Sequence, residues 1–157
     1  MLAKIEQWID QILSDYSGKS LSCSVFSNAF ADFYSHETLE NCFFVIVDKI
    51  PKPDFPELHE AGLGGFIDMD VHGITYKNTY FIKRGYENDL ALHFHELVHV
   101  QQWQRLGAQG FIGRYIQELH QHGYDDAPLE KMAYSLDSYF SAKKKAFDIK
   151  EYVQSKI

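Results

Sequence analysis

The chain has few cysteines, no long apolar run and no excess of positive charge. Its two cysteines, Cys23 and Cys42, are too few for a disulfide framework and are not spaced as zinc ligands, so we expect buried small side chains. No apolar run approaches the roughly 18 residues of a membrane-spanning helix. The formal net charge of −7 argues against a phosphate-binding surface. From these absences we expect the chain to have no membrane-spanning segment and no nucleic-acid partner.

We also expect no secretory signal at the N-terminus, because Glu6 and Asp10 interrupt its apolar residues. We therefore predict a cytoplasmic protein. The chain does contain enough apolar material for a core, since 45% of its 157 residues are hydrophobic and 15% are aromatic. This length and composition predict a single domain spanning residues 1–157.

The order of the predicted elements indicates an α+β fold, because strands come first and most helices follow. Residues 2–16 have the spacing of an amphipathic helix, and the run 43–47 is typical of a central strand. The predicted organisation is an N-terminal helical segment (1–42), a small sheet (43–83) and a set of helices (88–157). The other expected elements are strands at 66–69, 73–76 and 79–82 and helices at 90–106, 111–122 and about 129–154.

The most informative feature is the sequence His95-Glu96-Leu97-Val98-His99 inside the predicted helix 90–106. Residues i and i+4 lie on one face of a helix, so the two imidazoles can bind the same ion. Glu96 projects beside them, within reach of a water proton but outside the ligand set. The pattern His-Glu-x-x-His is typical of zinc hydrolases with two His ligands and a Glu general base.

The surroundings of the motif favour a buried helix. Asp89 can cap its start and Gly107 can end it. Apolar residues occupy most of the circumference outside the sector of His95 and His99, and such a helix is buried. Buried His and Glu side chains need compensating partners. The alternative to a metal site is a pair of core histidines bonded to backbone carbonyls.

A catalytic zinc site needs a third protein ligand. Glu130 is our candidate, because it lies in the first helical turn after Pro128 and the small Ala133 would let the two helices approach closely. Glu118 is the alternative, although its position in the middle of a helix is typical of a solvated side chain. Weaker candidates are His120, His122, Asp125 and Asp126. The choice between Glu130 and Glu118 stays open on spacing alone.

Two segments of the chain resemble a known family, the small bacterial gluzincin-type domains. The segments are His95-Glu96-Leu97-Val98-His99-Val100-Gln101-Gln102-Trp103 and Pro128-Leu129-Glu130-Lys131-Met132-Ala133-Tyr134. They are similar to the family elements His-Glu-Leu-x-His-Val-x-Gln and Pro-x-Glu-x-Glu-Ala. The resemblance covers about residues 43–140. Met132 departs from the family pattern, which has a second Glu at that position.

The resemblance implies a zincin-like minimal fold, with an N-terminal helix, a small mixed sheet, the buried motif helix and two further C-terminal helices. It implies one zinc ion held by His95, His99 and Glu130, with Glu96 as the base. Many of these domains have no assigned substrate, so the resemblance points to a site more than to a reaction.

These residues favour a zinc-dependent hydrolase, and specifically a metallopeptidase acting on a peptide or protein. Tyr134 is the candidate donor to the developing oxyanion, with Tyr124, His120 and His122 as alternatives. His93 faces away from His95 on the helical wheel, so we exclude it from the ligands. If 79–82 is an edge strand, an extended peptide could pair with it beside the metal.

Two other functions stay open. The chain could be a non-catalytic metal-binding interaction domain, because 157 residues leave little material for a second lobe around a substrate. It could also be a latent enzyme whose proline- and glycine-containing segment 51–65 covers the cleft until displaced. Solvent access to the metal separates these functions, since an open groove favours the enzyme. The oligomeric state is not predicted.

Overall fold

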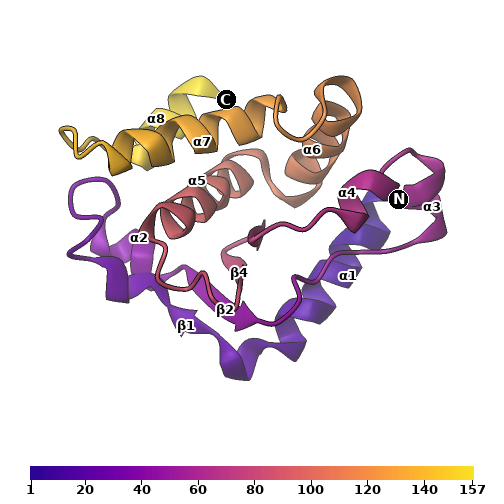
Figure 1. The fold of residues 1–157 in the computed structure, drawn as a ribbon, viewed down its shortest axis with the longest axis horizontal. Coiled ribbons are helices and arrows are strands. Elements are labelled where there is room, and N and C mark those ends of the chain that lie inside the picture. The colour runs from indigo at the N-terminus through magenta and orange to yellow at the C-terminus, as the bar shows by residue number, and fades with distance from the viewer.

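The computed structural model describes all 157 residues as a mixed α+β fold, with eight α-helices and a four-stranded sheet (Figure 1). This confirms the predicted α+β class. No helix combines the length and apolar character that crossing a membrane requires. The helices are α1 (Leu2–Asp15), α2 (His36–Glu40), α3 (Pro56–Glu60), α4 (Gly64–Asp68), α5 (Leu90–Leu106), α6 (Ala108–His122), α7 (Pro128–Ser141) and α8 (Ile149–Lys156).

The sheet has the strand order β1-β2-β4-β3, where β1 is Leu21–Ser22, β2 is Phe43–Val47, β3 is Gly73–Tyr76 and β4 is Thr79–Lys83. The predicted central strand is confirmed, because β2 pairs with β1 on one side and in parallel with β4 on the other. The idea that 79–82 is an edge strand is wrong. Strand β4 is internal, and the antiparallel β3 forms the edge beyond it.

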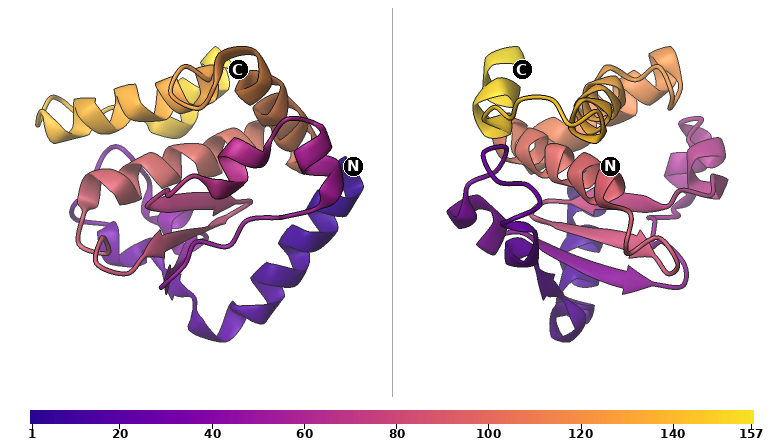
Figure 2. Two further views of the ribbon diagram at one scale, coloured as in Figure 1. Left: turned by 45° about the vertical axis from the view of Figure 1, so that its right-hand side comes forward. Right: turned by 60° about the vertical axis from the view of Figure 1, so that its left-hand side comes forward.

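The alternation of side chains along the strands gives the sheet two apolar faces. Phe44, Tyr80 and Ile82 belong to a core of 18 buried residues that also includes the apolar side chains of α5. Val45 and Phe81 belong to a second core of 14 buried residues, to which α1 contributes Ile5 and Ile9. Helix α5 therefore lies on one face of the sheet. Helices α7 and α8 pack on the side of α5 that faces away from the sheet (Figures 1 and 2).

Helix α5 is buried around its whole circumference, as predicted. Every residue from His93 to Trp103 is buried. Asp89 caps the helix by accepting a hydrogen bond from the Leu92 backbone N–H at 3.2 Å. Gly107 ends it with a positive φ of 74°, a conformation that L side chains rarely adopt. The polar side chains in this segment must therefore find partners inside the protein.

Two of the predicted elements are wrong. Residues 66–69 do not form a strand, because 64–68 fold into the short helix α4, whose last carbonyls accept hydrogen bonds from the Lys52 ammonium group. The expected helix over 129–154 is two helices, separated at 142–148 where Lys143 has a φ of 57°. Asp148 caps α8 by accepting from the Glu151 N–H at 3.0 Å. Three helices, not two, therefore follow the motif helix.

Candidate metal centre

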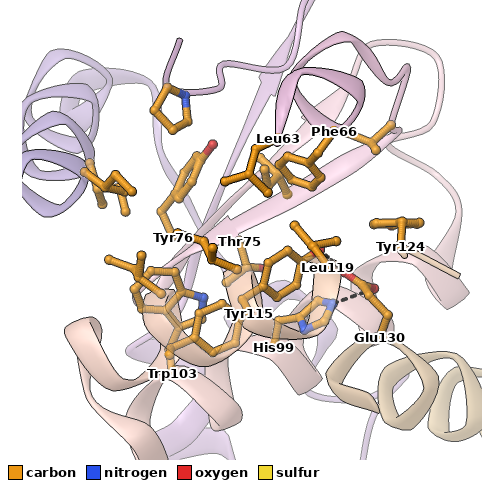
Figure 3. A pocket seen from close by; sticks show the side chains of 18 of the residues that line it. Leu63, Phe66, Thr75, Tyr76, His99, Trp103, Tyr115, Leu119, Tyr124 and Glu130 are labelled. Carbon is orange, nitrogen blue, oxygen red and sulfur yellow. Dashed lines mark hydrogen bonds and ion pairs between the residues drawn. The ribbon is translucent and has the colours of Figure 1, made fainter. Parts of the chain in front are cut away.

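The structure brings His95, His99 and Glu130 together at one point. The Oε1 atom of Glu130 lies 3.1 Å from His95 Nε2 and 3.0 Å from His99 Nε2, and the two Nε2 atoms are 3.2 Å apart. All three side chains are buried. Figure 3 shows His99 and Glu130 pointing toward one another at the edge of a pocket. The three predicted ligands thus form a group that could hold a metal ion.

The remaining ring nitrogens fix which imidazole atoms carry protons. His95 Nδ1 lies 2.9 Å from the Asp137 carboxylate, an acceptor, so it carries a hydrogen. His99 Nδ1 lies 2.7 Å from Oε1 of Gln102, whose amide nitrogen donates to the Leu129 carbonyl at 3.0 Å. This second contact orients the Gln102 oxygen toward His99. In the neutral rings both Nε2 atoms therefore present lone pairs toward Glu130.

Such a cluster fits a metal ion. Two imidazole lone pairs and a carboxylate oxygen repel one another unless a cation lies among them. Ligands about 2.0–2.1 Å from a tetrahedrally coordinated ion lie about 3.3 Å apart. The observed separations of 3.0 to 3.2 Å are close to this value. Imidazole nitrogens held by a second acceptor are also the usual arrangement of metal-binding histidines.

Without a metal, protons provide the positive charge. Burial lowers the pKa of His95, but the Asp137 and Glu130 carboxylates more than offset it and raise that pKa to about 10. Burial raises the pKa of Glu130, yet the neighbouring His99 and His95 hold it well below its usual range. The metal-free cluster is therefore a buried ion pair, and a metal ion must displace the proton on His95.

This competition predicts a pH-dependent effect of added zinc on stability. The folded metal-free protein keeps the His95 proton up to about pH 10, whereas the unfolded chain releases it near 6.5. Its stability should therefore fall as pH rises above 6.5, by up to about 1.4 kcal/mol per unit. The zinc-loaded protein has no such proton to lose, so the melting-temperature difference between the two forms should widen from pH 6 to 8.5. A constant difference would contradict this assignment.

Glu96 lies beside the cluster and not within it. Its Oε2 is 4.0 Å from His95 Nε2, and its Oε1 accepts a hydrogen bond from the Thr75 hydroxyl at 3.0 Å. Burial raises its pKa, although His95 and His99 act in the opposite direction. Gly73 makes room for it, because a Cβ atom there would lie 3.1 Å from the Glu96 carboxylate. Strand β3 thus holds the carboxylate near the ligands without making it one.

The tyrosines near the cluster occupy different positions. The Tyr134 ring packs on the His95 imidazole with centroids 4.4 Å apart, and its hydroxyl lies 3.3 Å from that of Tyr124. Tyr134 remains 43% exposed, so part of the residue is accessible from outside. The Tyr115 hydroxyl donates to Oε2 of Glu130, the oxygen that does not face the histidines. Tyr134 is therefore close to the site, while Tyr115 orients a ligand.

The other ligand candidates lie outside the cluster. Glu118 is buried rather than solvated, which corrects its interpretation from the sequence, and its carboxylate accepts from the Leu129 backbone N–H at 2.8 Å and from Arg114 Nε at 3.0 Å. Glu118 thereby caps the start of α7, where the Ala127 side chain makes no capping hydrogen bond. The capped residue, Leu129, directly precedes Glu130. The group also does not include His120, His122, Asp125 or Asp126.

The exclusion of His93 is confirmed. Its Nδ1 lies 2.7 Å from the Tyr80 hydroxyl and its Nε2 lies 2.8 Å from the Glu87 carbonyl oxygen, on the side of α5 that faces the sheet. Both cysteines are buried and free, as expected. The sequence interpretation missed Asp137, although it follows Glu130 by seven residues and so shares its helix face. Thr75 on β3 and Tyr115 on α6 could not be predicted, because no regular sequence spacing relates them to the motif.

Comparisons with known protein families, with curated proteins and with solved structures found no match to this chain.

Proposed function

We propose that this protein is a zinc-dependent hydrolase of the zincin-like type, and specifically a metallopeptidase. The observation that carries the proposal is the convergence of three ligand atoms from His95, His99 and Glu130, with the Glu96 carboxylate beside them and a pocket opening onto the group. A metal held only for structure would have a closed coordination sphere with four protein ligands. Here the group has three, and the pocket reaches His99 and Glu130.

Zinc is the metal that the donor set favours, because two imidazoles and one carboxylate are a common ligand set of catalytic zinc. When bound, zinc polarises a carbonyl oxygen and makes a water molecule more acidic. Side chains that do not themselves bind the metal hold each ligand in place. Asp137 holds the His95 ring, Gln102 holds the His99 ring, and Tyr115 holds the second oxygen of Glu130.

Glu96 is the proposed general base. It accepts a proton from the attacking water and later delivers it to the leaving amine. Burial raises the pKa of Glu96, which makes its carboxylate a stronger base than a solvated one. The Thr75 hydroxyl, 3.0 Å from its Oε1, fixes the orientation of the side chain. The other oxygen, Oε2, is then left to exchange the proton.

The substrate is proposed to be an extended peptide. Its backbone would pair with the free edge of β3, the strand that supports Glu96, and not with the internal β4. Tyr134 is the proposed donor to the developing oxyanion, since the residue is partly exposed and its ring contacts His95. The bonded Tyr124 hydroxyl would orient it.

A latent form of this enzyme is the second candidate. The segment 51–65 contributes to one wall of the pocket through Leu58 and Leu63, both buried. The segment is also bonded to the adjoining helix α4. The Lys52 ammonium group donates to the Phe66 carbonyl at 2.8 Å and also to the Met69 carbonyl. This attachment would keep the segment over the pocket until a partner displaced it.

The proposal is tested by metal content and by digestion. The purified protein should hold about one equivalent of zinc at neutral pH. Dipicolinate should remove both the metal and the cleavage of a peptide library, and added zinc should restore them. A protein that neither retains nor takes up zinc would rule out the hydrolase. Zinc uptake without any cleavage would favour the latent form or a binding domain.

A further inference from the structure

The pocket beside the candidate metal centre is apolar. Its 22 lining residues, of which 16 are hydrophobic, come from α1, the segment 53–71, β3, α5, α6, the connection after α6 and α7. Figure 3 shows Leu63 and Phe66 on one side of the pocket and His99 and Glu130 on the other, with Trp103 at the end away from Glu130. A group bound here would touch the metal ligands at one end and an apolar wall elsewhere.

The lining contains no lysine or arginine. Its only acidic groups are Glu96 and Glu130, which belong to the candidate site. An acidic side chain in the apolar part of the pocket would therefore have no counter-ion, and a lysine side chain there would have no acceptor other than the site itself. Burying an unpaired charge in this way is strongly unfavourable. The occupant must be neutral.

The size of the pocket further restricts which neutral side chains can bind in it. Its cavity volume is about 100 Å³. This is smaller than the roughly 150 Å³ apolar cavity that takes up benzene. A branched aliphatic side chain of the size of leucine matches this volume more closely than an indole does.

Resting on the proposed peptidase function, we infer that the pocket is the specificity site for a leucine- or isoleucine-sized side chain next to the cleaved bond. The substrate class is then a polypeptide with a neutral aliphatic side chain at this position, because no lysine or arginine lines the pocket to pair with an acidic one. Each additional buried methylene group strengthens binding several-fold, so the difference between leucine and alanine is expected to be about 10- to 100-fold.

The test uses N-acetylated amino-acid hydroxamates, which bind zinc and are not cleaved, with alanine, leucine, tryptophan, aspartate or lysine side chains. Calorimetry on the zinc-loaded protein should show the leucine probe binding about 10- to 100-fold more tightly than the alanine probe, and more tightly than the other three. Equal affinity for alanine and leucine would overturn the inference while leaving the metal chemistry intact.

A second arm separates the pocket from the metal. N-acetyl-leucinamide and N-acetyl-alaninamide are titrated into metal-free protein while the indole signal of Trp103, a lining residue, is followed by NMR. A leucine preference here supports the pocket even if the zinc hypothesis fails. If the leucine preference is absent from both arms, the inference is wrong.

Leu119→Lys supplies a matched variant, because Leu119 lines the pocket, is only partly buried and lies outside the proposed catalytic group. The new ammonium group should reverse the order of the aspartate and leucine probes. The control is the same substitution at the exposed Leu21 on β1, which should leave the order unchanged. A reversal in both variants, or in neither, would contradict the pocket assignment.

Discussion

Glu130→Ala is expected to abolish tight zinc binding. Glu130 Oε1 is the only carboxylate oxygen within hydrogen-bond distance of both histidine Nε2 atoms, so its loss leaves two ligands. The remaining carboxylate, Glu96, lies 4.0 Å from His95 Nε2 and is held by the Thr75 hydroxyl. The fall in affinity should exceed the about 10- to 100-fold loss that removal of an outer partner of a ligand gives. Competition with a chromogenic chelator measures this directly, and far-UV circular dichroism verifies that the variant is folded.

Glu118 provides the comparison for that experiment. Its carboxylate holds the Leu129 N–H next to Glu130, so Glu118→Ala should weaken zinc binding by about 10- to 100-fold without abolishing it. Glu118→Gln keeps an oxygen that can accept from Leu129 and should bind nearly as the unchanged protein does. If Glu118→Ala loses the metal and Glu130→Ala retains it, the ligand assignment is wrong.

The residues that could be predicted are those related by helical spacing. His95 and His99 are one helical turn apart, so their convergence follows from the period of the helix alone. Glu130 required one more element, the helix start after Pro128, and the family resemblance favoured it over Glu118. The buried environment of α5 was also predictable, because its apolar residues surround the whole helix.

The parts that could not be predicted depend on contacts between distant segments. Strands 73–76 and 79–82 were both expected, yet their order in the sheet depends on β2 pairing with β4 in parallel. Residues 66–69 have a strand-like composition, but the Lys52 ammonium group stabilises the end of a helix there. The break at 142–148 contains neither proline nor glycine, so only the cap formed by Asp148 marks it.

The ionisable groups of α5 show why the outer partners matter. Each buried polar group without a partner would cost roughly 1–3 kcal/mol. His95 and His99 each have one nitrogen bonded to a protein acceptor, so a metal ion has only to satisfy the other. Glu96 has one oxygen bonded to Thr75. The protein thus bonds one polar atom of each of these groups and leaves the other at the candidate metal centre.

Glu96→Gln is expected to separate catalysis from metal binding. The amide keeps the shape of the side chain and an oxygen for the Thr75 hydroxyl, but it lacks the carboxylate that accepts a proton. Since Glu96 is outside the group formed by His95, His99 and Glu130, the variant should keep its zinc and its fold. Peptide cleavage should fall by about 10²- to 10⁴-fold, the usual contribution of a positioned general acid–base.

The matched control for this variant is Glu37→Gln on the exposed face of α2, which should cleave as the unchanged protein does. If Glu96 only satisfies a buried neighbour, its substitution should shift the melting temperature, by the equivalent of roughly 1–3 kcal/mol, and leave the cleavage rate alone. Digestion of one peptide library by the three proteins, with melting curves and zinc content measured in parallel, distinguishes these outcomes. Equal cleavage by the Glu96→Gln variant and the unchanged protein would disprove the general-base role, because proton transfer to water or to a backbone group would then have to suffice.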